Sequence, residues 1–294
     1  MEWTPRDLSP PGGADPPGGD GRTGGEGHMG GDGQTGGEHR APHPVWEPGY
    51  REWAPPPELA GSVACLWTRV APPGDEAGHT LVLPDACCDL MWQSGRGAFV
   101  AGPDTAPWPS VLPAGTFLAG VRLRPGAGGP ALGLPLSGLL DQRVGVRDLG
   151  TRFGARLAGL LEPTLTPAVA LRLLAGAVGD LALESPADPL VTEAARLLAG
   201  PGAQAGDVAA RLGVGERQLL RRCRAAVGYG PATLRRVLRF RRFVTRIDAG
   251  PGGPDLARLA AETGYADQAH LSRECVRLAG LPPTALAMHR RPAA

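Results

Sequence analysis

The residues with the clearest potential for chemistry in this sequence are arginines at matching positions of a repeated motif. One copy reads Leu219-x-Arg221-x-Cys223-x4-Gly228-x2-Pro231, and the same residue types recur 52 positions later, from Leu271 to Pro283. An arginine side chain can donate two hydrogen bonds to O6 and N7 of a guanine base. The paired residues Arg221 and Arg273 therefore point to direct contact with DNA bases.

Each copy of the motif predicts a short helix, a turn and a second helix. The helices are expected at about 205–212 and 216–226 in the first unit and at about 255–262 and 267–278 in the second. Gly213 and Gly264 follow the short helices, where a left-handed conformation costs glycine little. Asp267 is placed to cap the last of these helices. The pattern is that of two tandem helix-turn-helix units.

Leucine and cysteine four residues apart would bury one face of each second helix and turn the opposite face outward. That face would carry the residues that read base edges in the major groove. The predicted DNA-binding residues are Arg217, Leu220, Arg221, Gln268, Ala269, His270 and Arg273. For His270, a structural role and a phosphate contact are the alternatives.

A connecting helix is predicted between the two units. Six arginines occur in the fourteen residues 234–247, and Val237, Phe240, Val244 and Ile247 form an apolar stripe at helical spacing. The candidates for contact with the DNA backbone are Arg235, Arg236, Arg239 and Arg242. The alternative is that these arginines only keep an exposed helix soluble.

The charge of the chain is divided unevenly. Residues 1–186 carry a net charge of −7, and residues 187–294 carry +8, although the whole chain has only +1. A basic domain of this kind favours double-stranded DNA as a partner. The five cysteines, the lack of an apolar run long enough for a membrane span and the lack of a secretory leader predict a cytoplasmic protein.

Composition predicts three regions: a disordered Gly- and Pro-rich tail at 1–44, a sensor-like regulatory domain at 45–186 and the DNA-binding domain at 187–294. The expected fold is α+β, with a small β-rich N-terminal domain followed by trailing helices and an all-α C-terminal domain. Strands are expected at 63–70, 79–83, 89–92, 97–100 and 116–123, and helices at about 150–161 and 167–183. The latter helices would either form a homodimer contact or pack on the sensor-like domain.

The stretch Gly264-Tyr-Ala-Asp-Gln-Ala-His-Leu-Ser-Arg273, followed by Gly280-Leu-Pro-Pro283, closely resembles the signature of the AraC/XylS family of bacterial transcription regulators. Leu212-Gly-Val-Gly-Glu-Arg-Gln-Leu-Leu-Arg221 resembles the first unit of that family. Two departures are Cys223 and Cys275, where the family usually has Phe, and Gly215, where it usually has a capping Ser. The resemblance implies a sequence-specific regulator that binds DNA and acts on RNA polymerase.

Two N-terminal stretches, residues 83–90 and 120–126, resemble the sensor-like domain of one subgroup of the same family. This resemblance implies a regulatory module that binds a small-molecule effector. Arg122 and Arg124 would share one face of a strand, where they could hold an anion or pair with Asp85 or Asp89. These four residues are the ligand-binding candidates.

Three cysteines of the N-terminal half, Cys65, Cys87 and Cys88, leave open a different reading, in which this domain binds a metal or accepts an alkyl group. Structural zinc prefers ligands two to four residues apart, whereas adjacent cysteines point to opposite faces of a strand. We therefore expect neither a metal nor a cofactor. No nucleophile–base pair or phosphate-binding loop is evident, so we expect no catalytic residues and no enzyme activity. A third reading is an architectural DNA binder without sequence preference.

Overall fold

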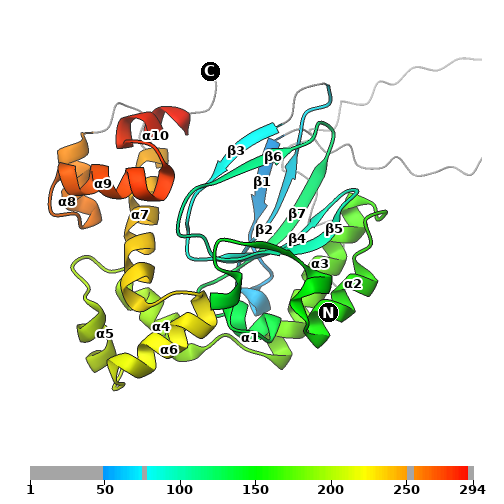
Figure 1. The fold of residues 1–294 in the computed structure, drawn as a ribbon, viewed down its shortest axis with the longest axis horizontal. Coiled ribbons are helices and arrows are strands. Elements are labelled where there is room, and N and C mark those ends of the chain that lie inside the picture. Colours follow the sequence, from blue (N-terminus) through cyan, green and yellow to red (C-terminus); the bar gives the residue numbers. More distant parts are fainter. Residues whose placement is uncertain (1–48, 75–77, 250–254, 291–294) are drawn as a thin grey trace, which may run out of the picture. The chain divides into compact units, whose positions relative to one another are not determined.

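The computed structural model describes residues 49–74, 78–249 and 255–290 (Figure 1). These residues form a β-rich N-terminal part followed by an all-helical C-terminal part, which confirms the predicted fold class. The tail predicted for residues 1–44 lies outside the described residues. Within the described ranges, none of the helices has the length and apolar character needed to cross a membrane.

A six-stranded antiparallel sheet forms the centre of the N-terminal part. Its strand order is β1-β2-β7-β4-β5-β8. The strands are β1 (Gly49–Trp53), β2 (Val63–Val70), β4 (Cys88–Gln93), β5 (Gly97–Ala101), β7 (Phe117–Leu123) and β8 (Arg143–Gly145). A second, two-stranded sheet pairs β3 (Gly78–Val82) with β6 (Trp108–Leu112). The two sheets confirm the β-rich character expected from the sequence.

Three of the strands, β1, β6 and β8, were not predicted. β1 lies at the edge of the sheet and is mostly exposed, so its sequence shows no apolar run. β6 contains Pro109, which lacks an amide hydrogen and is tolerated only where a strand has a free edge. β8 is three residues long. All three owe their extended conformation to a neighbouring strand rather than to their own sequence.

The trailing helices α2 (Arg152–Leu160) and α3 (Pro167–Glu184) cover one face of the large sheet (Figure 1). α3 contacts β4 and β7, and its residues Leu174, Val178 and Leu181 are buried. The indole Nε1 of Trp92 in β4 donates a hydrogen bond to the carbonyl oxygen of Glu162, before α3, at 2.9 Å. The apolar stripe of α3 therefore packs on the sheet of the same chain, which favours packing on the sensor-like domain over a homodimer contact.

Among its described residues, the C-terminal part has seven helices, two of which are the second helices of the predicted units. They are α4 (Pro189–Leu198), α5 (Ala205–Arg211), α6 (Glu216–Val227), α7 (Pro231–Ala249), α8 (Leu256–Thr263), α9 (Gln268–Ala279) and α10 (Pro283–His289). The bounds of α5, α6, α8 and α9 confirm the predicted helices to within one or two residues. Phe240 and Phe243 of α7 are completely buried in the hydrophobic core that these helices share.

Short helical segments after β7 pack closely against α6. They are α1 (Gly128–Leu132) and the 3-10 helix η3 (Leu136–Leu139). A Cβ atom on Gly129 would lie 2.4 Å from the carbonyl oxygen of Ala225 in α6, and a Cβ atom on Gly128 would lie 2.7 Å from the sulfur of Cys88. Only glycine permits approaches this close. Close packing thus explains the two glycines at the start of α1.

Candidate DNA-binding surface and sensor cavity

The second helices of the two units, α6 and α9, bury equivalent side chains. Leu219 and Cys223 in α6, like Leu271 and Cys275 in α9, have at most 1% of their surface exposed. Five of the predicted DNA-binding residues are solvent-exposed: Arg217, Arg221, Gln268, Ala269 and Arg273. All but Gln268 lie on the face opposite the buried pair, whereas Gln268 is the first residue of α9, three positions before Leu271.

Arg221 and Arg273 thus occupy the same position relative to the buried leucine and cysteine of their helices. Both side chains are exposed, and Arg221 lines a shallow hollow beside Pro135 and Ser137.

The other two predicted DNA-binding residues, Leu220 and His270, are half-buried. Leu220 lies against the turn before α7, because a Cβ atom on Gly230 would come within 2.6 Å of its Cδ1. His270 packs edge-on against the ring of Tyr265, with ring centroids 5.3 Å apart, and its Nε2 lies 3.3 Å from Nη2 of Arg239. These contacts favour the structural alternative for His270.

The turns that start the two helices differ in their caps. The carboxylate of Asp267 accepts a hydrogen bond from the backbone N–H of His270 at 2.6 Å, as predicted for an N-cap residue. Gly215 occupies the corresponding position before α6 and provides no side-chain cap. Gly213 and Gly264 end the preceding helices with φ angles of 67° and 85°, which confirms the predicted left-handed turns.

The α7 arginines predicted to contact the DNA backbone are half-buried and bonded within the domain. Nη1 of Arg235 donates to the carbonyl oxygen of Ala203 at 2.8 Å and to the side chain of Gln204. Nη1 of Arg242 donates to the carbonyl oxygen of Thr263 at 3.3 Å. Both side chains therefore join α7 to a neighbouring turn or helix end, a role that the sequence did not indicate.

Arg236 and Arg239 attach α7 to α9 through one carboxylate. Oε2 of Glu274 lies 3.2 Å from Nε of Arg236 and 3.6 Å from Nη2 of Arg239. These contacts are ion pairs without aligned hydrogen bonds, since Oε2 has no hydrogen-bond partner among the described residues. The guanidinium of Arg239 also lies 4.3 Å from the centre of the Tyr265 ring. The two arginines thus hold the second unit on α7.

The first unit is attached by a different ion pair. Both nitrogens on one edge of the Arg222 guanidinium donate to the carboxylate of Asp188 at 2.6 Å. The same carboxylate caps α4 by accepting a hydrogen bond from the backbone N–H of Val191 at 3.2 Å. The backbone N–H of Asp188 donates to the carbonyl oxygen of Gly126, after β7. Asp188 therefore links α6, α4 and the end of the large sheet.

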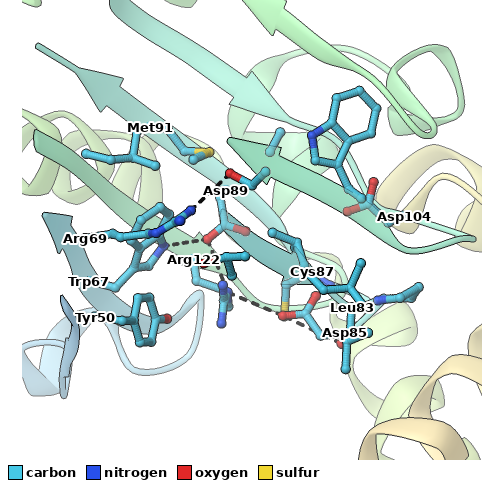
Figure 2. Close-up of a pocket in the computed structure, with 18 of the residues that line it drawn as sticks. Tyr50, Trp67, Arg69, Leu83, Asp85, Cys87, Asp89, Met91, Asp104 and Arg122 are labelled. Carbon is cyan, nitrogen blue, oxygen red and sulfur yellow. Dashed lines mark hydrogen bonds and ion pairs between the residues drawn. The ribbon is translucent and has the colours of Figure 1, made fainter. Parts of the chain in front are cut away.

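A cavity of about 960 Å³ lies on the face of the large sheet that α3 leaves uncovered. The two-stranded sheet contributes to its wall, and its lining includes Trp67, Asp85, Asp89, Met91 and Arg122 (Figure 2). We call it the sensor cavity. Its volume is within the range of small-molecule sites. The lining contains both apolar and charged side chains, whereas the interior of a packed hydrophobic core is mainly apolar.

Arg122 pairs with three carboxylates in the sensor cavity, and Figure 2 shows two of them, Asp85 and Asp89. Its Nε lies 3.1 Å from Asp89 and 3.4 Å from Asp85, and its Nη1 lies 3.5 Å from Glu52. Burial raises the pKa of Asp89, an effect that Arg122 partly opposes. Burial lowers the pKa of Arg122, but Asp89 and Asp85 outweigh it and raise that pKa. The sequence left two roles open for Arg122, holding an anion or pairing with Asp85 or Asp89. In the structure Arg122 pairs with both aspartates.

Arg124 does not join this cluster. Its Nε donates to the carbonyl oxygens of Ala60 and Val63 at 2.9 and 3.0 Å. The strand β7 ends at Leu123, so Arg124 no longer follows the alternation that placed it beside Arg122. The expectation that both arginines would share a binding face was therefore wrong for Arg124.

All five cysteines are buried, and none is in a disulfide. In the part of the chain that the structure describes, no three His, Cys, Asp or Glu side chains are grouped so that they could hold a metal ion. Burial raises the pKa of the Cys65 thiol to about 12 and the pKa values of Cys87 and Cys88 well above the usual range. These thiols remain protonated at neutral pH, which does not favour a nucleophilic or metal-binding role.

The sequence did not identify the aromatic part of the sensor cavity. The indole of Trp67 lies over Gly120, where a Cβ atom would come within 2.4 Å of the ring. Its Nε1 donates to Asp89 at 2.7 Å, and the ring of Tyr50 lies 5.8 Å away. The alternation within β2 indicates that Trp67 and Cys65 share a face. That Gly120 lies opposite Trp67 follows only from the pairing of β2 with β7.

Two family models match the chain. Residues 51–145 match a domain of unknown function, DUF6597, and residues 192–288 match a helix-turn-helix domain. Among curated proteins no relative matches. Similar solved structures include ToxT from Vibrio cholerae O395, with 11% identity and a TM-score of 0.42 over 78% of this chain and 99% of that chain.

A second similar structure is wild-type ToxT from Vibrio cholerae strain SCE256 bound to an unsaturated fatty acid. It has 11% identity and a TM-score of 0.40, over 77% of this chain and 95% of that chain.

Proposed function

We propose that the chain is a transcription regulator of the AraC/XylS type whose helices α6 and α9 read a specific DNA sequence, and that the sensor cavity controls this binding. The observation that carries the first part is the equivalence of Arg221 and Arg273. Both are exposed, and both belong to helices that bury the same leucine–cysteine pair. A helix with exposed arginines at its N-terminal half fits the major groove. The partner is double-stranded DNA.

The exposed residues of α6 and α9 suit different bases, so we expect the two helices to recognise different base pairs. Arg217 and Arg221 in α6 suit guanine, whereas Gln268 in α9 suits adenine and Arg273 suits guanine. The four α7 arginines predicted to contact the DNA backbone are engaged within the domain, so we expect them to add little to the contacts with DNA. We infer that Leu220 and His270 contribute by shaping the surface rather than by donating hydrogen bonds to bases.

Control by the N-terminal domain is supported by the short path from the sensor cavity to the DNA-binding core. Asp85 contacts Arg122 in the cavity at 3.4 Å, and the next residue, Ala86, is buried in the same hydrophobic cluster as Leu219 and Cys223. Ala86 has a φ angle of 69°, which is strained for a residue with a Cβ atom. An effector that moves Asp85 would therefore act on the core beneath α6.

Selection of bound sites from random DNA, followed by affinity measurements on the full-length chain, tests the first part. Arg221→Ala and Arg273→Ala should each cost about 1–3 kcal/mol on the selected site and relax the preference at one base position. Arg172→Ala, an exposed arginine of α3, removes the same charge far from the reading helices and serves as the control. It should leave the affinity unchanged.

Two results would contradict the proposal in different ways. If both variants lost the same affinity on every DNA sequence, the two arginines would be phosphate contacts. If the wild-type chain preferred its selected site over random DNA by less than about a thousandfold, an architectural binder without specificity would be the better description.

A further inference from the structure

The outward faces of α6 and α9 differ, although the two helices bury the same leucine–cysteine pair. Three exposed positions on each outward face correspond through the 52-residue offset of the repeated motif. In α6 these positions hold Arg217, Arg221 and Arg224, and in α9 they hold Ala269, Arg273 and Val276. Small apolar side chains in α9 thus stand where α6 has its first and last arginines.

The three arginines of α6 share one face of the helix. Their spacing of four and three residues places them in one row, and all three line the same shallow hollow. Among the residues that the structure describes, their guanidinium groups form neither hydrogen bonds nor ion pairs. Exposed guanidinium groups suit guanine, which presents two acceptors in the major groove.

The outward face of α9 carries an exposed valine. Val276 is 53% exposed, and on α6 and α9, both of which the structure describes in full, no other large apolar side chain is exposed. Helix propensity does not explain this residue, because a branched Cβ restricts the side chain against the preceding turn. Val276 follows Arg273 by three residues and Ala269 by seven, so all three share a face. This face suits a partner that offers hydrogen-bond acceptors beside apolar groups.

The major groove of DNA offers that combination. Guanine presents O6 and N7 as acceptors, and thymine presents a C5-methyl group that small apolar side chains contact. Residues three or four apart in a helix advance about 4.5–6 Å, and neighbouring base pairs are about 3.4 Å apart. The side chains before and after Arg273 would therefore lie one or two base steps to either side of it.

We propose that α9 reads thymine through Ala269 and Val276, whose methyl groups contact the C5-methyl groups of thymines on either side of the base pair that Arg273 contacts. The half of the DNA site under α9 then has A·T pairs flanking a G·C pair, whereas the half under α6 is rich in G·C pairs. The inference rests on the proposed reading of DNA by these two helices. It adds Val276 and Arg224 to the residues that determine specificity.

Replacement of thymine by uracil in the selected DNA site tests the inference on the full-length chain. Uracil lacks the C5-methyl group and keeps the O4 acceptor of thymine, so the replacement removes only the apolar contact. The half under α9 is the one whose base preference relaxes in Arg273→Ala. Uracil beside the relaxed position should weaken binding about fourfold, the effect of burying one carbon of an apolar group. Thymines outside this half should tolerate the replacement.

The variant Val276→Ala identifies the side chain that senses the methyl group. At one of the two flanking thymines, uracil should then weaken binding less than about twofold, because the partner of the methyl group is gone. Leu183→Ala removes an exposed apolar side chain from α3 and should behave as the wild type does. The assignment is overturned if the wild type binds uracil and thymine equally in this half, or if Val276→Ala keeps the full response at both positions.

Transfer of the α6 face to α9 gives an independent test. A chain with Ala269→Arg and Val276→Arg has the three outward arginines of α6 on both helices. Repeated site selection with this chain should replace the A·T pairs flanking the Arg273 position by G·C pairs. An unchanged preference at both positions would overturn the inference.

The outcomes for the inference and for the proposed function are distinguishable. If the wild-type chain selects no DNA sequence, both fail. If it selects a site in which no A·T pair flanks the position read by Arg273, the reading of DNA stands and the contact with thymine fails.

Discussion

The two helix-turn-helix units share a motif but are held in place by different contacts. The second unit is self-contained: Asp267 caps α9, and Glu274 attaches it to Arg236 and Arg239 of α7. The first unit has no side-chain cap at Gly215. It depends on the Arg222–Asp188 pair and on packing against α1 and η3, which follow the large sheet.

The two units therefore bury the same pair of side chains, although different contacts outside that core hold them in place. Leu219 and Cys223 bury the same face of α6 that Leu271 and Cys275 bury in α9.

Outside that core, α7 holds both units, the first through Arg235 and the second through Arg236 and Arg239. The first unit also packs against α1 and η3, whereas α7 itself lines the sensor cavity with Arg241 and Val244. A change in the N-terminal domain therefore has a route to each unit, through α1 and η3 to α6 and through α7 to α9.

The largest expected effect concerns the two equivalent thiols. Burial raises the pKa of Cys223 and that of Cys275 to about 12, compared with the usual value of 9.0. At pH 8, iodoacetamide should therefore alkylate both at least about a thousandfold more slowly than a free thiol, because each pKa unit lowers the thiolate fraction tenfold. Timed alkylation and peptide mass spectrometry measure both rates in one sample.

The same pKa shift fixes how these thiols affect stability. A thiol with a raised folded-state pKa leaves the free energy of unfolding unaffected at low pH. It lowers that free energy as the pH rises above about 9, because the unfolded thiol ionises first. If Cys223 reacted much faster than Cys275 at pH 8, the first unit would open more often than the second. Rapid alkylation of both would contradict the burial of the shared core.

A smaller effect is expected from the carboxylate that holds the second unit. Glu274→Ala should lower the free energy of unfolding by about 2–3 kcal/mol, between the values for exposed and buried pairs, because two half-buried arginines lose their partner. Glu193→Ala removes an exposed carboxylate paired with Arg196 on α4 and is the control, with no measurable change expected. Chemical denaturation of the full-length variants provides the comparison. A loss no larger than that of the control would show that α7 does not support the second unit.

The helices of both units could be predicted from the sequence because their signals are local. The bounds of α6 and α9 follow from leucine and cysteine at helical spacing and from glycines that end the preceding helices. The exposure of Arg221 and Arg273 follows from the same spacing. The contacts of Arg239 could not be predicted, because Glu274 and Tyr265 lie on other elements.

The sensor cavity could be predicted only in part. The alternation within β4 places Asp89 and Met91 on one face, and the resemblance of residues 83–90 to a sensor-like domain suggested a ligand site. The strand β1, which brings Glu52 to the rim, has no apolar pattern of its own. The cavity itself depends on how the two sheets are arranged, and no stretch of sequence encodes that spacing.

The smallest expected effect separates the two units by their caps alone. Asp267→Ala removes a side-chain hydrogen bond to the first turn of α9 and should destabilise the chain by about 1 kcal/mol. Gly215→Asp supplies the missing cap before α6. It should raise the free energy of unfolding by a few tenths of a kcal/mol, because glycine is itself a tolerated N-cap. If Gly215→Asp also tightened binding to the selected DNA site and Asp267→Ala did not weaken it, the order of α6 would limit DNA binding. Equal and opposite changes in affinity would instead mean that both units are equally ordered, and the asymmetry between their supports would have no consequence for reading DNA.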